Sequence, residues 1–500
     1  MEKRPRENSM DDVFGDKTWS ASQQKALISV LQRGKSVFIT GPGGVGKSEI
    51  IRQIRRVMNS RSMRVAVLAH TGIAALNIDG QTIYSFMHFN PESAKKSKEE
   101  ISAEYLAKKP YWVREFQSYK ALIVDEISMV DPQDFEKIDW ILQQTRRDYR
   151  PFGGLQLILV GDFHQLPPPV LSGSRSFVFE SPSFFRAIDD VIELKEMWRQ
   201  KDPDFVVMLH RLRIGKPLPE DIQALNDRVG AELDCASRGI KPTCLYPRNA
   251  DVDSVNQAEL EKLTTQEAQF ELKFGKYPKM RKAPESDSAI IKLLKGMNVI
   301  ERVSPFDKID KLTDYNLKVQ TLKIGAQVML TYNLDIDAGL VNGTRGIVIG
   351  FALQNKDKAE DERRVFHDTD FAKKDKNYLK PDETLPIVRF TNGTEMEIGY
   401  VRTTVEHDGV EAYAWQVGLK LAWATTIHKS QGLTLDAVET DISGCFDTGM
   451  AYVALSRVIR LDALTLKTAV NTSHFRANPA VISFYEKPWV MHKALTNADV

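Results

Sequence analysis

The chain has 500 residues, which at ~150 residues per domain suggests roughly three domains. Its 68 Lys and Arg almost balance 67 Asp and Glu, so the formal net charge is only +1, and 42% of the residues are apolar. This composition predicts a folded globular protein and excludes both a disordered chain and an overall basic coat. Binding to nucleic acid would therefore require a locally basic groove.

Targeting and redox features point to an ordinary intracellular setting. No apolar run approaches the ~20 residues of a membrane helix, and no apolar stretch follows the basic N-terminal residues as in a secretory signal. The N-terminal segment is also too acidic to be a clear mitochondrial targeting segment. Cys235, Cys244 and Cys445 form no CxxC pair, so neither a disulfide framework nor a zinc site is indicated. We expect a reducing compartment, either nucleus or cytoplasm.

The first part of the chain alternates between strand and helix patterns. Residues 1–18 are polar and are expected to form a flexible arm, whereas residues 91–109 are charged and are expected to form an exposed insertion. Continuous apolar strands separated by helices predict a parallel sheet covered on both faces. This α/β domain is expected over residues 19–190. Its apolar runs are residues 37–40, 65–68, 121–124 and 157–160.

A second α/β domain is expected in two parts, residues 191–320 and 413–500, with its pattern returning near Leu419. Between the two parts, residues 321–412 have short β-rich runs separated by Asn-Gly pairs at 342–343 and 392–393. Asn-Gly between apolar runs is the strongest local signal for a hairpin. The sequence therefore predicts a small antiparallel β-barrel inserted into the second domain.

A phosphate-binding loop is the strongest motif in the chain. Residues 41–48 fit G-x-x-x-x-G-K-[ST], with an apolar strand before them and a helical pattern after them. Backbone N–H groups and the helix N-terminus would hold phosphate oxygens, while Lys47 would bridge the β- and γ-phosphates and Ser48 would bind Mg. The nucleotide contacts expected from this loop are Gly41, Gly43, Gly44, Val45, Gly46, Lys47 and Ser48.

Five further residues predict that the bound nucleotide is hydrolysed. Asp125 follows an apolar strand and could hold Mg, and Glu126 could orient and deprotonate the attacking water. Gln165 follows another apolar strand and could hydrogen-bond the γ-phosphate. Arg199 and Arg457 could neutralise the charge that develops on the transferred phosphoryl group.

Two segments are candidates for contact with a nucleic-acid strand. After the second strand, backbone N–H groups near Thr71 and Gly72 could grip a phosphate, and aromatic rings that follow could stack on bases, although such a cluster more often belongs to a core. The polar loop 426–432 is the other candidate. The residues assigned to DNA contact are Thr71, Gly72, Tyr84, Phe86, His428, Lys429 and Ser430.

These segments together resemble the petite-integration-frequency (PIF) DNA helicases, in the 5′-to-3′ branch of helicase superfamily 1 near RecD. The resemblance covers nearly the whole chain, from about residue 20 to about residue 485. The stretch 134–154 resembles the signature that separates this family from RecD-like relatives. The other segments that carry the resemblance are 41–48, 71–75, 125–129, 161–168, 198–200, 339–346, 427–436 and 452–457.

The resemblance implies two RecA-like P-loop motor domains with parallel sheets, and a small SH3-like β-barrel inserted in the second. It also implies ATP- and Mg-dependent unwinding of DNA, with 5′-to-3′ translocation on single-stranded DNA. Gly432 and an adenine-reading Gln near the start would join the nucleotide site. Distance to Gly34 favours Gln24 for this role, while the spacing from Ser20 favours Gln23.

Two other classes of protein remain as alternatives. A ring ATPase that remodels proteins would take its arginines from a neighbouring subunit, whereas Arg199 and Arg457 both lie in this chain. An inactive single-strand-binding module would not need Lys47, Asp125 and Glu126. We therefore expect a monomeric helicase that acts on single-stranded and on tailed or forked duplex DNA. Its expected setting is replication, repair, recombination and telomere maintenance, with replication or single-strand-binding proteins as partners.

Overall fold

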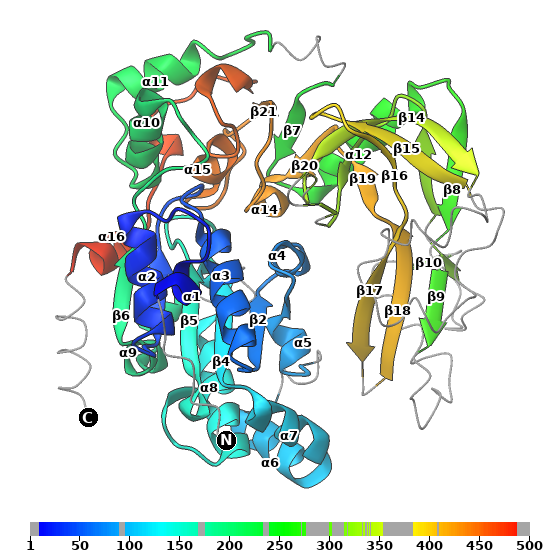
Figure 1. Cartoon of the computed structure of the whole chain (residues 1–500). Helices are drawn as coiled ribbons and strands as arrows, with labels where there is room; N and C mark the ends of the chain where they lie inside the picture. Colours follow the sequence, from blue (N-terminus) through cyan, green and yellow to red (C-terminus); the bar gives the residue numbers. More distant parts are fainter. Residues whose placement is uncertain are drawn as a thin grey trace. The chain divides into compact units, whose positions relative to one another are not determined.

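The chain forms two compact units in the computed structural model (Figure 1). Unit 1 comprises residues 1–233, 245–247 and 426–500, and unit 2 comprises residues 234–244 and 248–425. The two units are described separately below. The structure describes residues 10–89, 96–168, 176–233, 240–271, 273–276, 300–302, 315–317, 319–332, 334–335, 338, 340, 342–353, 384–407 and 410–487.

Unit 1 is built on a six-stranded sheet with the strand order β3-β2-β4-β5-β1-β6. All the neighbouring strands in it pair in parallel, which confirms the predicted α/β fold. The four predicted apolar runs became β1, β2, β4 and β5, because a run that is buried on both faces has no polar side. The strands are β1 (Val37–Thr40), β2 (Val65–Ala69), β3 (Gln81–Thr82), β4 (Ala121–Asp125), β5 (Gln156–Gly161) and β6 (Asp190–Glu193).

Helices cover both faces of this sheet and separate its core into two clusters. Successive side chains of a strand point to opposite faces, so Phe38 joins one cluster while Val37 and Ile39 join the other. The helices up to this sheet's last strand are α1 (Met10–Phe14), α2 (Ala21–Leu31), α3 (Lys47–Ser60), α4 (Gly72–Asn77), α5 (Ile83–Phe86), α6 (Lys98–Lys108), α7 (Pro110–Ser118), α8 (Pro132–Arg146) and α9 (Pro182–Ala187).

Two segments differ from the exposed arrangement expected of them. Val13 of α1 is buried, so the described part of the expected arm packs against the fold. Residues 98–108 are a helix rather than an exposed insertion, and its Ile101 and Tyr105 are both buried. Their spacing of four residues makes one apolar face, which the many charges in this segment concealed. Residues 1–9 and 90–95 lie outside the described part of the chain.

The C-terminal part of unit 1 contributes a third buried cluster around the parallel pair β21–β22. Phe205 and Leu209 of α10 pack there with Tyr452 and Val453 of α15. The elements are α10 (Pro203–Arg213), α11 (Pro219–Asn226), α14 (Ile427–Ser430), β21 (Val438–Thr440), α15 (Met450–Leu455), β22 (Leu464–Leu466) and α16 (Pro479–Glu486). Strands β7 (Thr243–Tyr246) and β20 (Ala424–Thr426) lie where the chain passes between the units.

Unit 2 contains a five-stranded antiparallel sheet with the order β16-β15-β14-β13-β19. The predicted hairpin at 392–393 is confirmed, because Arg389 pairs with Glu395 across it. Among the described strands no pairing joins the edges β16 and β19, so the sheet is open rather than a closed barrel. Leu419 belongs to the edge strand β19 and not to a returning α/β pattern.

The remaining elements of unit 2 are one helix and strands that belong to smaller sheets. They form a three-stranded sheet, β17-β18-β9, and two-stranded pairs, β12-β8 and β10-β11. The elements of the unit are α12 (Asn249–Glu261), β8 (Glu267–Glu271), β9 (Lys273–Lys276), β10 (Ile300–Arg302), β11 (Tyr315–Leu317), β12 (Val319–Lys323), β13 (Gln327–Leu330), β14 (Arg345–Leu353), β15 (Thr384–Phe390), β16 (Glu395–Glu397), β17 (Tyr400–His407), β18 (Val410–Val417) and β19 (Leu419–Leu421).

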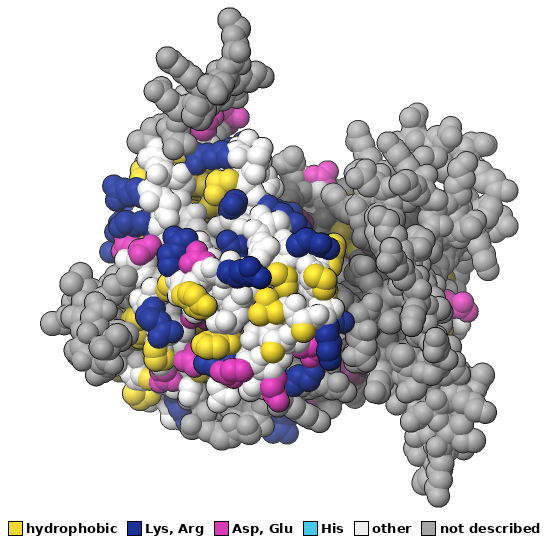
Figure 2. All heavy atoms as spheres, turned by 90° about the horizontal axis from the view of Figure 1, so that it is seen from below, with side chains coloured by type: hydrophobic (Ala, Val, Ile, Leu, Met, Phe, Trp, Pro, Cys, Tyr) yellow, Lys and Arg dark blue, Asp and Glu magenta, His cyan; other side chains and the backbone are white. Residues whose placement is uncertain are grey.

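The surface agrees with the balanced composition. Figure 2 shows a face on which Lys and Arg side chains are interspersed with acidic and apolar ones, so this face carries no uninterrupted basic coat. None of the helices in the described part of the chain has both the length and the apolar character needed to cross a membrane.

Candidate nucleotide-binding site

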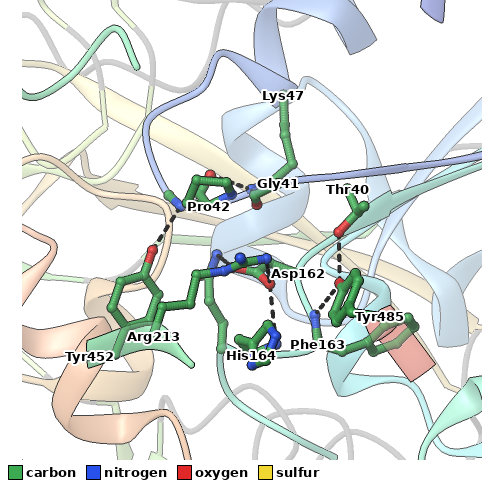
Figure 3. A network of polar contacts seen from close by, with 12 residues as sticks. Thr40, Gly41, Pro42, Lys47, Asp162, Phe163, His164, Arg213, Tyr452 and Tyr485 are labelled. Carbon is green, nitrogen blue, oxygen red and sulfur yellow. Dashed lines mark hydrogen bonds and ion pairs between the residues drawn. The ribbon is translucent and has the colours of Figure 1, made fainter. Parts of the chain in front are cut away.

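The phosphate loop lies between the end of β1 and the start of α3, as the motif predicts. Its residues Gly44 and Gly46 have φ angles of +95° and +82°, a left-handed conformation that favours glycine. The Lys47 ammonium donates hydrogen bonds to the carbonyl oxygens of Gly41, at 2.7 Å, and Pro42, at 3.0 Å. The loop and its lysine therefore form one ordered cradle at the N-terminus of α3 (Figure 3).

Two carboxylates lie beside this lysine: that of Asp125, which is buried and ends β4, and that of Glu126, which is half-buried and follows it. Glu126 has a φ angle of +51°, an uncommon conformation for a residue with a side chain, of the kind that gathers at functional sites. Its carboxylate accepts a hydrogen bond of 2.8 Å from the Gln431 amide, while Asp125 accepts one of 2.9 Å from the Glu126 N–H. Burial, reinforced by the neighbouring Glu126, raises the pKa of Asp125 to about 7.

Electrostatics link the lysine to these carboxylates. Burial lowers the pKa of Lys47, against the opposing attraction of Asp162, Glu126 and Asp125. Burial also raises the pKa of Glu126, although Lys47 and the hydrogen bond from Gln431 oppose that shift. The site thus brings together ionisable groups with shifted pKa values, in which Lys47 attracts the carboxylates while Asp125 and Glu126 repel each other.

The two predicted arginines converge on one residue of the phosphate loop. A Cβ atom added to Gly43 would lie 3.1 Å from an Arg457 guanidinium nitrogen and 3.4 Å from one of Arg199. Arg457 is 1% exposed, and its guanidinium donates to the Ser456 hydroxyl at 2.7 Å. Arg199 donates to the Ser456 carbonyl at 3.1 Å and to that of Gly432 at 3.4 Å. Both cations therefore face the loop through fixed hydrogen bonds.

Gln165 is tied to a buried ion pair that the motifs did not reveal. Asp162, which is fully buried, accepts hydrogen bonds from Arg213 at 2.8 and 3.0 Å and from the Gln165 amide at 3.3 Å. Burial alone would raise the pKa of Asp162, but Arg213 outweighs that effect and holds the pKa at about 2. Arg213 closes α10, and no local sequence signal connects it to Asp162.

Two tyrosines complete this network, and sequence reasoning also missed them (Figure 3). The Tyr485 hydroxyl lies 2.7 Å from the Thr40 hydroxyl and accepts a hydrogen bond of 3.2 Å from the Phe163 N–H. The Tyr452 hydroxyl accepts a hydrogen bond of 3.1 Å from the N–H of Gly43. Tyrosines from α15 and α16 thus contact the end of β1 and the segments that follow β1 and β5.

The structure favours Gln23, not Gln24, beside the phosphate loop. The Gln23 amide donates to the Val45 carbonyl at 3.1 Å, and its side chain is buried. The Gln24 amide instead donates to Trp19 at 2.8 Å. Adjacent helical residues point about 100° apart, so only one of the two can face the loop. Ser20 caps α2 and shares hydrogen bonds with Gln23, which fixes the direction of the Gln23 side chain, so of the two alternatives Gln23 lies beside the loop.

Two of the residues assigned to DNA contact lie in the interior instead. Phe86 is 2% exposed and packs against Phe116, with ring centroids 5.5 Å apart. Ser430 is 0% exposed, and its hydroxyl donates to the Ile427 carbonyl at 2.8 Å. The structure therefore does not bring either side chain to the surface, and their burial favours a packing role over contact with DNA.

Among the other residues assigned to DNA contact, four are at least partly exposed, namely Thr71, Tyr84, His428 and Lys429. Thr71 directly precedes α4, which begins at Gly72, and its hydroxyl accepts the Ala74 N–H at 3.2 Å. The Tyr84 hydroxyl donates to the Asp134 carboxylate at 2.9 Å. Lys429 is exposed, while the neighbouring His428 is partly buried with its ring 6.3 Å from that of Phe446. These residues remain candidates.

Comparisons with known proteins agree with this arrangement. A model of the PIF1-like helicase family matches residues 19–216, and a model of the 2B domain of the DNA helicase Pif1 matches residues 315–351. The ATP-dependent DNA helicase PIF1 of Xenopus laevis is 34% identical over 469 residues, which are 93% of this chain and 64% of that protein. The chain thus spans slightly less than two thirds of the length of this relative.

Solved structures extend the similarity to the whole fold. The Pif1 helicase of Candida albicans is 33% identical with a TM-score of 0.71, and the match covers 94% of this chain and 99% of that one. The Pif1 helicase from Bacteroides, in a complex with ADP-AlF3 and ssDNA, is 25% identical with a TM-score of 0.59, and covers 94% and 97%. Similarity of this extent and identity shows that the chain belongs to the PIF1-like helicase family.

Proposed function

We propose that this protein is an ATP-dependent DNA helicase that translocates 5′-to-3′ on single-stranded DNA and unwinds duplex DNA. The observation that carries the proposal is the convergence of Arg199 and Arg457 on Gly43 of the phosphate loop. Two cations at that position, with Arg457 buried and Arg199 half-buried, fit the stabilisation of a transferred phosphoryl group rather than nucleotide binding alone. The names of the relatives support the same activity, and the 5′-to-3′ polarity is that of the family.

ATP would bind with its phosphates on the loop, and Mg would bridge them to the protein. Asp125 and Ser48 supply the carboxylate and hydroxyl oxygens that Mg prefers. The Asp125 carboxylate is buried with a raised pKa, which suits a position that gains a cation. Within the described residues no three His, Cys, Asp or Glu are grouped as metal ligands, and an ion held partly by phosphate oxygens needs no such group. Mg would supply charge neutralisation on the phosphates.

In hydrolysis, each of the surrounding residues would have a separate role. Lys47 binds the β- and γ-phosphates, and Glu126 orients the water and accepts its proton, with its own direction fixed by Gln431. Gln165 responds to the γ-phosphate, while Arg199 and Arg457 stabilise the charge that develops on it. Gln23 lies where it could contact the adenine, and Gly432 presents its carbonyl to Arg199.

The layout proposed for the chain is two RecA-like motor domains and a small SH3-like domain. The boundaries proposed from the sequence are 1–18 for an arm, 19–190 for the first motor domain, 191–320 with 413–500 for the second, and 321–412 for the insertion. The open antiparallel sheet and the match to a Pif1 2B domain support a β-domain within the insertion. The single-stranded DNA would contact Thr71, Gly72, Tyr84, His428 and Lys429.

We further propose that the protein acts as a monomer on tailed or forked duplexes during replication, repair and recombination. ATPase rates with and without single-stranded DNA, followed by unwinding of duplexes with a 5′ or a 3′ tail, test the proposal directly. We expect DNA to stimulate the ATPase and only the 5′ tail to support unwinding. An ATPase rate that does not change when DNA is added would contradict the proposed helicase activity. Unwinding that prefers the 3′ tail would contradict the proposed 5′-to-3′ polarity.

A further inference from the structure

Tyr452 lies against the phosphate loop without a role in the mechanism above. It is one of the six residues of α15, all of them buried, and it is itself 3% exposed. Its hydroxyl oxygen accepts the N–H of Gly43 at 3.1 Å (Figure 3). Backbone N–H groups of a phosphate loop point towards phosphate oxygens, so this hydroxyl shares the space that the phosphates would enter.

The same residue of the loop has two guanidiniums and a hydroxyl near it. A Cβ on Gly43 would meet the Arg457 guanidinium at 3.1 Å, that of Arg199 at 3.4 Å and the Ser456 hydroxyl at 3.8 Å. The Tyr452 phenol and both guanidiniums therefore surround one backbone position. Three donors around one position suit an acceptor with several oxygens, such as a terminal phosphate.

The phenol has a proton left to donate. Within the described part of the chain, its hydrogen bond is the one it accepts from Gly43, and the hydroxyl proton has no acceptor. A buried O–H without an acceptor is costly, which indicates that a ligand supplies one. Burial and the nearby Asp162 raise the pKa of Tyr452, while Arg213, the Gly43 N–H and Arg457 oppose them. The group therefore stays a neutral donor near neutral pH.

We propose that Tyr452 is a further catalytic residue, whose hydroxyl donates a hydrogen bond to the γ-phosphate beside Arg457 and Arg199. The role rests on the proposed ATPase activity. Water adds to the γ-phosphorus, the bond from that phosphorus to the bridging oxygen breaks, and ADP and phosphate leave. Tyr452 keeps its proton throughout, because it stabilises charge on the phosphoryl oxygens without accepting or losing a proton.

Tyr452→Phe tests this role, since it removes the hydroxyl and keeps the ring that packs in the core. We expect kcat for ATP to fall roughly tenfold or more. Affinity for a non-hydrolysable ATP analogue should fall several-fold, while affinity for ADP stays within about twofold, because only the analogue carries a γ-phosphate. ADP binding by the same sample also shows that the variant is folded.

Tyr105→Phe is the matched control. It also removes a buried phenol, one that donates to the Met87 carbonyl at 2.6 Å within the core around α6. It should lower stability and leave the ratio of ADP to analogue affinity unchanged. An unchanged kcat in Tyr452→Phe, or equal weakening of ADP and the analogue, would overturn the proposal. A wild-type protein without ATPase activity would instead reject the proposed function.

A spectroscopic measurement covers the case in which Tyr452→Phe does not fold. Meta-fluorotyrosine placed only at position 452 keeps the hydroxyl and gives a single fluorine resonance. We expect this resonance to shift when aluminium fluoride, which mimics the γ-phosphate, is added to the ADP complex, and to shift less with ADP alone. No difference between the two additions would show that the hydroxyl does not face the γ-phosphate.

Discussion

The two faces of the six-stranded sheet are packed with different kinds of side chain. On the face covered by α2 and α3, the buried cluster among the described residues is aliphatic apart from Trp19. On the opposite face, the cluster also contains many aromatic rings. They are Phe38, Phe86, Tyr105, Phe116, Tyr119, Phe135, Phe152, Phe163, Phe177, Phe179, Phe184 and Phe484.

The two faces differ in their side chains because different kinds of segment pack on each of them. The aliphatic face packs regular helices closely onto strands, and α3 carries the phosphate loop at its N-terminus. The aromatic face gathers short helices and turns from distant parts of the chain, where large rings with edge and stacked contacts fill irregular space. Phe484, for example, stacks on Phe179 with centroids 4.5 Å apart. The aliphatic face thus holds the loop, and the aromatic face holds the molecule's distant segments together.

The largest effect should come from a change at the loop that alters neither face. In Lys47→Ala the cation that binds the phosphates is lost, so ATP hydrolysis should become undetectable in a steady-state assay. Lys47 contacts loop carbonyls rather than either cluster, so the packing of both faces should be kept and circular dichroism should show a folded variant. Glu126→Gln is its companion and should still bind ATP. Loss of ATP binding in Glu126→Gln would contradict its assigned role with the water.

Breaking the aromatic face should cost the most stability. Phe484→Ala removes a ring packed on Phe179 and Phe163, and we expect about 3–5 kcal/mol less free energy of unfolding. ATP should also bind more weakly, because the neighbouring Tyr485 contacts Thr40 at the end of β1. Urea titration and nucleotide titration measure the two effects. If Phe484→Ala kept the free energy of unfolding of the wild type, the packing of the aromatic face would not depend on α16.

The buried ion pair beside the loop should make stability depend on pH. Asp162→Asn leaves Arg213 buried without its counter-charge, which should cost about 3 kcal/mol near neutral pH. The folded pKa of Asp162, about 2, lies below the ordinary value of about 3.9. The carboxylate therefore stabilises the fold above pH about 4, and that contribution is lost as the pH falls through about 2. The difference in free energy of unfolding between wild type and Asp162→Asn should therefore become smaller as the pH falls from about 4 to about 2. A difference that does not change with pH would show that the loss of stability does not come from the Asp162 charge.

The smallest effect should come from the aliphatic face. Ile54→Val removes one methyl group from a fully buried position on α3, at a cost of about 1 kcal/mol. The helix and its loop stay in place, so kcat should remain within about twofold of wild type. A kcat that falls with so small a loss of stability would show that loop geometry depends on close packing beneath α3.

The sequence predicts most of this core because its strands are buried on both faces. Residues 37–40 form a continuous run that is buried on both faces of the sheet, which is easy to recognise in the sequence, and β1 has the predicted bounds. The phosphate loop needs glycine at left-handed positions and a lysine at fixed spacing, so a short motif suffices to find it. Gln23 and Gln24 are adjacent, and only the turn of α2 from its cap at Ser20 distinguishes them.

Other parts of the site leave no local pattern. Phe86 looks the same in sequence whether its ring stacks on a base or fills a core. Asp162 and Arg213 are 51 residues apart, and nothing near either residue identifies its partner. The groups whose spacing is fixed by one loop were therefore predictable, whereas pairings between distant elements were not.

Tyr485 and Thr40 make contact across 445 residues of chain. During synthesis, β1 and its loop therefore emerge long before the helix that supports them from the aromatic face. The first sheet must remain with part of that face uncovered until α16 has been made, since long-range contacts form last and exposed apolar surface favours aggregation. A nascent chain that ends before residue 479 would contain the whole phosphate loop but would lack α16, which packs on the aromatic face of the sheet that carries this loop. The nucleotide site would thus mature only when translation of the helicase fold is almost complete.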